Sequence, residues 1–167
     1  DSLTEIANRR RYNEALENEW RRCARSGAPL SLAIIDVDHF KAYNDRLGHA
    51  AGDTVLRSIA TTLHGFMRRP GDLAARYGGE EFILLLPQVD ANAAQRIGED
   101  IRASVESLRL HHPDSPVSPY VTISLGGMTT VPTDGQVDPQ FFQQADTALY
   151  KAKSAGRNRV VWQRAAS

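Results

Sequence analysis

The mostly apolar segment from residue 30 to residue 37 constrains the fold of this chain more than any other feature. Eight residues are too few to cross a membrane and suit a strand that is buried on both faces of a sheet. Asp36 lies inside the segment and Asp38 directly follows it. A carboxylate at the end of a buried strand is costly unless it is paired or binds a metal. Asp38 is expected to cap the next helix, which leaves Asp36 as a candidate site residue.

Apolar residues at helical spacing and β-prone runs predict a mixed arrangement of helices and strands around that segment. The first expected helix is 7–25, with its apolar residues at helical spacing over 12–24 and a stop at 26–29. The others are a short one carrying Phe40, Lys41 and Tyr43, one whose inner face spans 55–66, then 91–108 and 141–153. The further strands are expected at 73–77, 82–86, 120–131 and 159–162. Gly78 and Gly79 separate two of these strands and predict a hairpin, because glycine readily adopts the positive φ that such turns need. A purely parallel sheet is therefore excluded.

Composition limits the class of protein. The 167 residues suffice for one domain with a core, and we expect a single domain over 1–167. The 20 basic residues balance the 20 acidic ones, which argues against a broad nucleic-acid-binding face. No apolar run approaches the ~20 residues of a membrane span, so this segment is expected to make no membrane contact. Cys23 is the only cysteine, which excludes an internal disulfide and is typical of the cytoplasm.

Two adjacent acids, Glu80 and Glu81, follow the glycine pair at the expected hairpin tip. They repel each other unless a cation or a donor lies close. Pairing of the two segments as neighbouring strands would bring Asp36 near Glu80 and create the oxygen-rich site that Mg²⁺ prefers, completed by substrate phosphates. Glycines at the tip would let a nucleotide approach the backbone. Taken singly, Glu81 could be a solvated turn residue and the glycine pair only a turn.

Polar residues elsewhere could complete a nucleotide site. Lys41, at the start of a short helix, suits phosphate together with the free N–H groups there. Asn44 and Asp53 present the donors and acceptors that a guanine edge requires, although both could instead cap helix ends. Lys153 and Arg157 form a second basic element, which could equally be ordinary capping at a helix C-terminus.

The sequence lacks the motifs of several other common phosphate-binding, zinc-binding and catalytic sites. The chain has no P-loop motif of the form Gly-x-x-x-x-Gly-Lys-Ser/Thr. No histidine or cysteine spacing fits zinc, and His111 and His112 are expected in a loop without partners nearby. No Gly-x-Ser-x-Gly element supports a serine nucleophile.

A series of short motifs runs in order over practically the whole chain. They are Asp1 to Thr4 (DSLT), Asn8 to Arg10 (NRR), Ile35 to Lys41 (IDVDHFK), Asn44 and Asp45, Leu47 to His49 (LGH), Gly52 and Asp53, Arg76 to Phe82 (RYGGEEF), Ala148 to Lys153 (ALYKAK) and Gly156 to Asn158 (GRN). Together they closely resemble the GGDEF family of diguanylate cyclases, in the variant with a Gly-Gly-Glu-Glu-Phe signature.

The resemblance implies an α/β (α+β) fold with a central, mostly antiparallel five-stranded sheet wrapped by helices, similar to the palm of polymerases and adenylyl cyclases. It implies that two GTP molecules are joined into cyclic di-GMP with loss of two pyrophosphates. Each domain would bind one GTP and two Mg²⁺ ions, with Mn²⁺ as an alternative, so a homodimer would be needed for catalysis. We expect a cytoplasmic domain at the C-terminal part of a longer signalling protein, whose missing N-terminal part could be membrane-anchored.

The resemblance also implies roles for individual residues. The metal ligands would be Asp36, Glu80 and the Val37 carbonyl, and Glu81 would help metal binding or activate the 3′-hydroxyl. Asn44 and Asp53 would recognise guanine, and Asp53 favours GTP over ATP. The triphosphate would be held by Lys41, Lys153, Arg157 and the main-chain N–H groups of His39 and Phe40, with Gly78 and Gly79 beside the nucleotide. The catalytic group would comprise Glu80, Glu81 and Lys41.

Arg69 and Asp72 match the inhibitory Arg-x-x-Asp site of the same family, which implies inhibition by bound cyclic di-GMP. Outside that resemblance, a charged turn around Pro70 and Gly71 would be the simpler interpretation. Some relatives have an arginine that supports this site, and the corresponding position in this chain is Asp100, with Arg96 and Arg102 nearby. The geometry of any inhibited form that crosslinks two domains is therefore left open.

Three alternatives to an active cyclase stay open. The domain could be an idle module that binds cyclic di-GMP or GTP, although the retained Asp36, Glu80, Lys41 and Lys153 weigh against that. It could be a structural dimerisation unit, which would not explain the retained charged motif residues. A different polymerase-like or nuclease activity is the third, but the chain lacks a basic groove for a long nucleic acid.

Overall fold

A computed structural model of the chain describes residues 1–165. Five strands form one sheet in the order β2-β3-β1-β4-β5. Three of the four strand pairs are antiparallel, and only β4 and β5 run parallel. The elements along the chain are α1 (Arg9–Ser26), β1 (Leu30–Val37), α2 (Phe40–Leu47), α3 (His49–Phe66), β2 (Leu73–Arg76), β3 (Glu81–Pro87), α4 (Ala91–Ser107), β4 (Ile123–Thr130), α5 (Pro139–Ser154) and β5 (Val160–Arg164).

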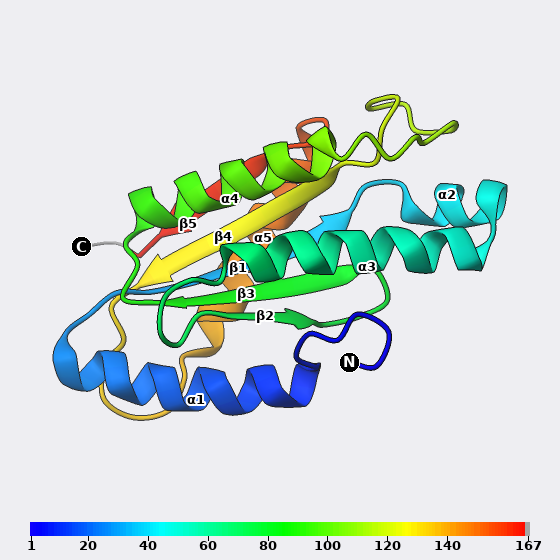
Figure 1. Ribbon diagram of the computed structural model, residues 1–167. Coiled ribbons are helices and arrows are strands. Elements are labelled where there is room, and N and C mark those ends of the chain that lie inside the picture. The colour runs from blue at the N-terminus through cyan, green and yellow to red at the C-terminus, as the bar shows by residue number, and fades with distance from the viewer. Residues whose placement is uncertain (166–167) are drawn as a thin grey trace.

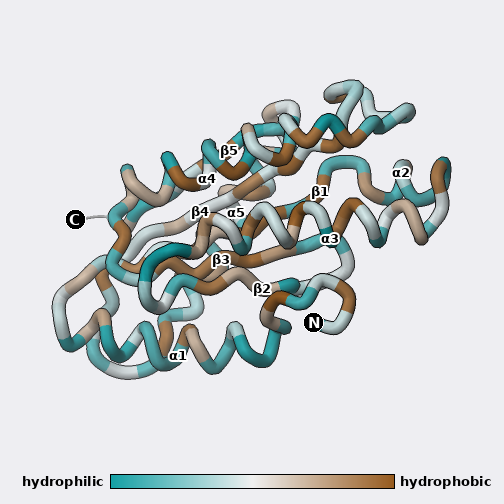
Figure 2. The backbone as a smooth tube through the Cα atoms, in the orientation of Figure 1, coloured by the Kyte–Doolittle hydropathy of each residue, from teal (hydrophilic) through white to brown (hydrophobic). Residues whose placement is uncertain are grey.

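Helices cover both faces of the sheet (Figure 1). On one face, α2, α3 and α4 enclose a core with alternate residues of β1 such as Ala33 and Ile35. On the other, α1 and α5 pack on Leu32 and Ile34. Every residue of β1 is buried, and Figure 2 shows hydrophobic residues along the central strands. The predicted central strand and the mostly antiparallel five-stranded sheet are confirmed.

The element boundaries differ from the predictions by a few residues, and the helix caps explain why. The side chain of Asn8 caps the N-terminus of α1, and Gly27, at φ 70°, ends this helix within the predicted stop, so α1 begins and ends within two residues of the predicted 7–25. Asp90 and Asp138 cap α4 and α5 in the same way. The strand expected at 120–131 is shorter, and the last strand lies slightly later than 159–162.

The topology gives the sheet two functionally distinct ends. The end of β1 at Val37 meets the start of β3 at Glu81 and the start of β4 at Ile123. The opposite end carries the segment 69–72, which directly precedes β2. The acidic hairpin and the Arg69–Asp72 turn therefore lie at opposite ends of the molecule's central layer.

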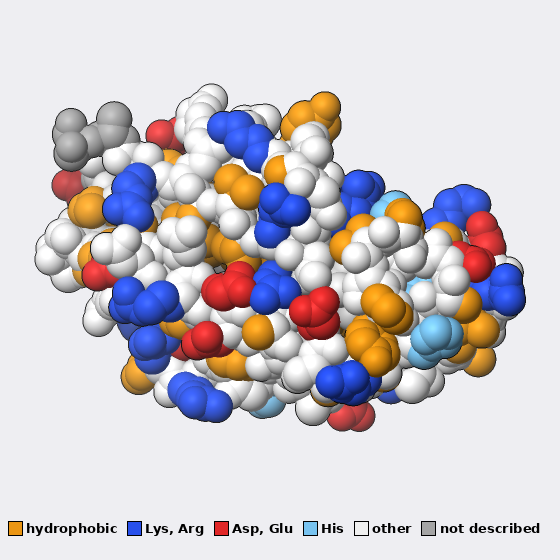
Figure 3. All heavy atoms as spheres, turned by 90° about the horizontal axis from the view of Figure 1, so that it is seen from above, with side chains coloured by type: hydrophobic (Ala, Val, Ile, Leu, Met, Phe, Trp, Pro, Cys, Tyr) orange, Lys and Arg blue, Asp and Glu red, His pale blue; other side chains and the backbone are white. Residues whose placement is uncertain are grey.

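The surface carries both signs of charge. Seen from above in Figure 3, acidic and basic side chains are interspersed over this face. Within residues 1–165, none of the helices is both long enough and apolar enough to cross a membrane.

Candidate active site

The predicted hairpin joins β2 to β3, and its tip is held by Arg76. The guanidinium of Arg76 donates to the Gly79 carbonyl at 2.7 and 3.2 Å and pairs with Asp1 at 3.5 Å. The expectation of positive φ in the glycine pair is wrong, because neither Gly78 nor Gly79 has a positive φ. A Cβ added at Gly79 would meet no other atom of the chain within 4 Å. The absence of a side chain there therefore leaves open space at the tip rather than allowing a special turn.

Acidic side chains of β1 and β3 lie together at this end of the sheet, beside a lysine of α5. Asp36 is opposite Glu81 in the antiparallel register, and the Val37 N–H donates to the Glu80 carbonyl at 3.2 Å. The Lys153 ammonium forms an ion pair with the Asp36 carboxylate. Burial raises the pKa of the Glu81 carboxyl, and the nearby Asp36 carboxylate raises it further, whereas Lys153 opposes both. The expected proximity of the two acidic segments is thus present.

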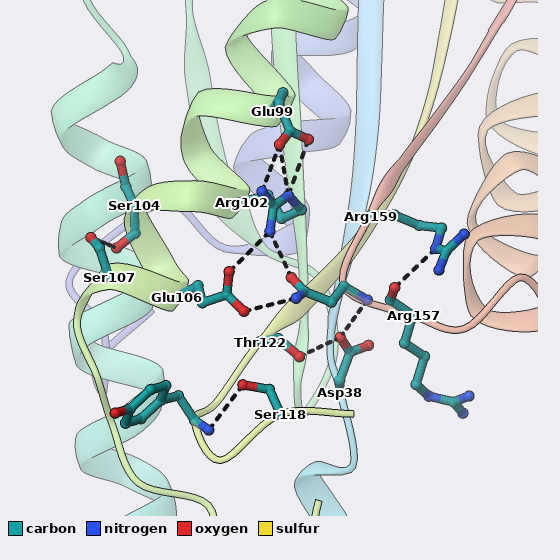
Figure 4. A network of polar contacts seen from close by, with 12 residues as sticks. Asp38, Glu99, Arg102, Ser104, Glu106, Ser107, Ser118, Thr122, Arg157 and Arg159 are labelled. Carbon is teal, nitrogen blue, oxygen red and sulfur yellow. Dashed lines mark hydrogen bonds and ion pairs between the residues drawn. The ribbon is translucent and has the colours of Figure 1, made fainter. Parts of the chain in front are cut away.

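Asp38 does not cap α2, contrary to the prediction. The N-cap residue of α2 is His39, in the left-handed conformation at φ 51°, and no side chain caps this helix. Asp38 is 3% exposed, and its carboxylate accepts hydrogen bonds from the Thr122 and Ser124 hydroxyls at 2.8 and 2.6 Å and from the Asn158 N–H at 3.0 Å. Figure 4 shows this carboxylate amid a wider polar network that includes Arg102. Asp38 therefore joins β1 to β4 and to the turn after α5.

An open cavity of about 490 Å³ lies between α2, α3 and the hairpin tip, within the size range of small-molecule sites. Six of its lining residues were predicted from the sequence as site residues, namely Phe40, Lys41, Asn44, Asp53, Gly79 and Glu80. The other lining residues are Asp45, His49, Leu56 and Arg76. Segments up to forty residues apart in the chain thus contribute to one site.

Asn44 is oriented by close contact with α3. A Cβ on Gly52 would lie 1.8 Å from Asn44 Oδ1, so only glycine leaves room for this side chain. Asn44 Oδ1 is buried and has no hydrogen-bond partner within residues 1–165. An unpartnered buried acceptor is costly unless a ligand supplies a donor. Asn44 and Asp53 lie within helices whose caps are other residues, so the interpretation of both as helix-end caps is wrong.

Basic groups lie around the start of α2. The Lys41 side chain is 89% exposed and pairs with Asp45 at 2.9 Å, so its ammonium is accessible from the cavity side. Partial burial lowers the pKa of the His39 imidazole, and the nearby Arg157 guanidinium lowers it further. Arg157 also donates to the Lys153 carbonyl at 3.4 Å, as the capping interpretation expected.

The donor set at the hairpin consists of oxygen atoms that could hold a divalent cation. Within residues 1–165, no three His, Cys, Asp or Glu side chains are grouped as a metal site. The predicted set contains only two carboxylates, Asp36 and Glu80, with the Val37 carbonyl. Hard oxygen donors of this kind suit Mg²⁺, which usually keeps waters and substrate phosphates as its other ligands. The ammonium of Lys153 already pairs with Asp36, and a bound cation would share that carboxylate with it. The residues therefore fit the ion.

A second cavity, of about 560 Å³, lies beside the Arg69–Asp72 turn. Asp72 has a fully buried side chain, accepts from the Arg69 N–H at 3.0 Å and lies 3.9 Å from the Arg69 guanidinium. Its Oδ1 atom has no partner in the described chain. Burial raises the pKa of the Asp72 carboxyl. Asp100 is exposed on α4 and Arg102 is engaged with Glu99, Glu106 and Asn158.

The contribution of α1 to this second cavity was not predicted from the sequence. Arg11, Arg22 and Arg25 line it, together with Glu19, which is 7% exposed and has an unpartnered Oε2. A buried acid on the inner face of an otherwise apolar helix stripe was the available signal. His112 was also missed, because it is 2% exposed and hydrogen-bonded rather than without partners.

The fold and the acidic hairpin define an α+β domain with a palm-like sheet. The family model described as "Diguanylate cyclase, GGDEF domain" matches residues 1–159. The chain belongs to this family.

Curated relatives and solved structures agree with that assignment. The chain is 42% identical over 160 residues to the diguanylate cyclase DgcP of Pseudomonas aeruginosa and 38% identical over 161 residues to the response regulator PleD of Caulobacter vibrioides. Each alignment covers 96% of this chain but only 23% and 35% of those proteins, so the chain spans at most about a third of their lengths.

Two solved structures show the same fold. The GGDEF domain of DgcB from Caulobacter crescentus, in complex with c-di-GMP, gives a TM-score of 0.86 at 34% identity, covering 97% of this chain and 91% of that one. The active GGEEF domain of a diguanylate cyclase from Vibrio cholerae gives 0.81 at 31% identity, covering 97% and 100%.

Proposed function

We propose that this chain is a diguanylate cyclase domain that condenses two GTP molecules into cyclic di-GMP and two pyrophosphates. The observation that carries the proposal is that one cavity is lined both by Asn44 and Asp53 and by Gly79 and Glu80. A base-recognising wall and an acidic hairpin tip on one cavity suit a purine nucleotide whose phosphates extend toward the sheet. The family membership over residues 1–159 supports the same activity.

Guanine recognition is assigned to the α2–α3 side of the cavity. The buried Asn44 Oδ1 would accept from the guanine base, and the Asp53 carboxylate would accept from its neighbouring N–H groups. Adenine presents a different donor pattern on that edge, so a site built from these acceptors favours GTP.

Phosphate binding is assigned to the cations at the end of the sheet. Lys41, Lys153 and Arg157 would neutralise the triphosphate, and the N–H groups of His39 and Phe40 at the uncapped start of α2 would donate to it. Binding of the nucleotide requires Lys153 to share its ammonium between Asp36 and a phosphate.

The reaction joins the 3′-oxygen of one GTP to the α-phosphorus of the other, and the bond to the departing pyrophosphate breaks. Asp36, Glu80 and the Val37 carbonyl would hold two Mg²⁺ ions, or Mn²⁺, which supply charge neutralisation and acidify the attacking hydroxyl. Glu81, which lies opposite Asp36 in the antiparallel register, would assist metal binding or accept the hydroxyl proton.

One cavity accommodates one nucleotide, so two copies of the domain must face each other for the two bonds to form. A two-fold symmetric homodimer places each 3′-hydroxyl against the other copy's α-phosphate. Dimerisation is then the natural point of control. We also propose that residues 1–167 form one domain of a longer signalling protein. Residues 166 and 167 of this predicted domain lie outside the residues that the structure describes. The free, buried Cys23 and the GTP substrate support a cytoplasmic location.

Product inhibition is assigned to Arg69 and Asp72. The unpartnered Asp72 Oδ1 could accept from a guanine N–H, and Arg69 with the arginines of α1 could pair with phosphates. Binding there would slow the enzyme without occupying the active site.

The test is incubation of concentrated protein with GTP and Mg²⁺, followed by mass spectrometry of the products, with Asp36→Ala as the inactive control. Cyclic di-GMP from the wild type alone supports both the activity and the role of Asp36. If fusion to a dimeric coiled coil also yields no product, the activity is wrong and the domain is a binding module. Wild-type rates in Asp36→Ala would overturn the metal assignment.

A further inference from the structure

The loop between α4 and β4 holds a buried histidine against the start of α2. His112 is 2% exposed, although it lies in a segment with no regular structure. The backbone around it is closed by hydrogen bonds from the His112 N–H to the Pro119 carbonyl at 2.8 Å and from the Val121 N–H to the Leu110 carbonyl at 2.7 Å. The imidazole is therefore presented from a well-defined loop.

Both ring nitrogens of His112 are used, and their partners specify the tautomer. The Asp114 N–H donates to Nδ1 at 3.2 Å, so Nδ1 is the acceptor. Nε2 therefore carries the hydrogen and donates to the carbonyl of His39 at 2.9 Å. The arrangement requires the neutral imidazole with its proton on Nε2.

The carbonyl that accepts this bond belongs to a residue in an unfavourable backbone conformation. His39 has φ 51° and ψ 39°, in the left-handed region that non-glycine residues rarely adopt. Its carbonyl also accepts the first hydrogen bond of α2, from the Tyr43 N–H at 3.1 Å. Two donors therefore hold this peptide in a conformation that the chain would otherwise avoid.

The same loop contacts α2 along its length. The rings of His112 and Tyr43 meet edge to face, with centroids 5.2 Å apart. At the far end of the helix, Arg46 pairs with Asp114 at 3.5 Å. The loop thus supports α2 from its first turn to its last.

We propose that His112 is a positioning residue for nucleotide binding, acting through the Nε2–H donor to the His39 carbonyl. By fixing this left-handed turn, His112 aims the N–H groups of His39 and Phe40 at the phosphates. The inference rests on the proposed function, since those N–H groups are assigned to the triphosphate. It predicts that loss of the bond weakens recognition of phosphate and leaves recognition of the base intact.

The experiment compares His112→Asn with His112→Gln. The glutamine Nε2 can reach the position of the histidine Nε2, whereas the shorter asparagine amide corresponds only to Nδ1. His111→Asn is the matched control, because His111 is an exposed neighbour. Binding is measured with the GTP analogue that has a methylene group between the α- and β-phosphorus, which cannot release pyrophosphate, and with guanosine.

For His112→Asn we expect affinity for the analogue to fall about tenfold, as for one lost hydrogen bond, while guanosine affinity stays constant. His112→Gln should recover binding to within about threefold of the wild type, and His111→Asn should match the wild type. A general structural defect would weaken both ligands together and would not be rescued by glutamine. That pattern, or unchanged binding in His112→Asn, would overturn the proposal.

If His112→Asn shows no cooperative thermal transition, this variant is unfolded, and the test then uses the folded His112→Gln variant. Near-wild-type analogue binding supports the positioning role, and a tenfold loss contradicts it. If the wild type itself binds neither ligand, the proposed function fails and the inference fails with it. If the wild type binds both ligands but the variants do not show the expected affinities, the inference about His112 is wrong and the proposed function stands.

Discussion

At one end of the sheet the Asp36 carboxylate lies beside the ammonium of Lys153, and at the other the Asp72 carboxylate lies beside the guanidinium of Arg69. Asp36 and Lys153 are 117 residues apart in the chain and meet only because α5 packs on the sheet. Arg69 and Asp72 belong to one turn, 3.9 Å apart, and Asp72 keeps an unpartnered oxygen. The first pair therefore forms only when the whole chain folds. The second pair forms within one turn and leaves the Asp72 Oδ1 atom without a hydrogen-bond donor.

This difference matches the two roles proposed for the ends. Substrate at the hairpin end must compete with an existing ion pair, so binding there requires cations to accompany the phosphates. A ligand at the opposite end meets a buried acceptor that still lacks a donor. Substitutions at the two ends should therefore affect different quantities, namely turnover at the first and inhibition or stability at the second.

The largest expected effect is at the hairpin tip. Glu80→Gln keeps the size of the side chain but removes the charge assigned to metal binding, and should lower kcat by about 10³-fold or more, since a metal contributes several kcal/mol of transition-state stabilisation. Steady-state rates at saturating GTP and Mg²⁺ would measure this. Glu17→Gln, an exposed site on α1, should be neutral. Turnover within tenfold of the wild type in Glu80→Gln would remove Glu80 from the catalytic group.

The second effect concerns the base-recognising wall of the cavity. Asn44→Ala removes an acceptor assigned to guanine and should raise the KM for GTP by about 10- to 100-fold, with a smaller change in kcat. Competition between GTP and ATP would show whether the preference for guanine falls in parallel. An unchanged preference would mean that Asn44 only packs against Gly52.

The third effect distinguishes catalysis at the hairpin end of the sheet from inhibition at the Arg69–Asp72 end. Arg69→Ala should leave the initial rate unchanged, because Arg69 lies at the end of the sheet remote from the hairpin. It should weaken inhibition by added cyclic di-GMP by about tenfold or more, as expected for loss of charge-assisted hydrogen bonds. Inhibition curves at fixed GTP would test this. An Arg69→Ala enzyme inhibited as strongly as the wild type would place the inhibitory site elsewhere.

The smallest effect is on stability. The raised pKa of Asp72 means that its charged form is disfavoured in the folded state, so its contribution to stability is most favourable below the usual carboxyl pKa and is lost as the pH rises through the folded pKa. Asp72→Asn should therefore raise Tm at pH 7 by about 2–4 °C, with the advantage disappearing below about pH 4. Thermal scans against pH would show it, and a lower Tm at pH 7 would contradict it.

Some of these features followed from the sequence because they depend on neighbouring residues. The apolar run of β1, the two β-prone runs on either side of Gly78 and Gly79 and the alternation of helices and strands follow from local periodicity and residue type. The GGDEF family membership followed from motifs whose order and spacing are visible in the chain. Local patterns also gave most helix positions, including the end of α1 at Gly27.

Other features required the tertiary structure, because they arise between side chains that are distant in the chain. Asp38 was predicted as a helix cap from its position alone, but its partners lie on β4 and in the turn at Asn158. The fit of Asn44 against Gly52 depends on the angle between two helices. His112 contacts His39 across 73 residues.

The sequence by itself thus determined which elements form and to which family the chain belongs, because both depend on residue types at short spacing. Only the tertiary structure decided which acids pair with cations, which acceptors stay unpartnered and which loop supports the start of α2. Those outcomes depend on burial and on donor–acceptor distances across packed elements, quantities that no local pattern contains.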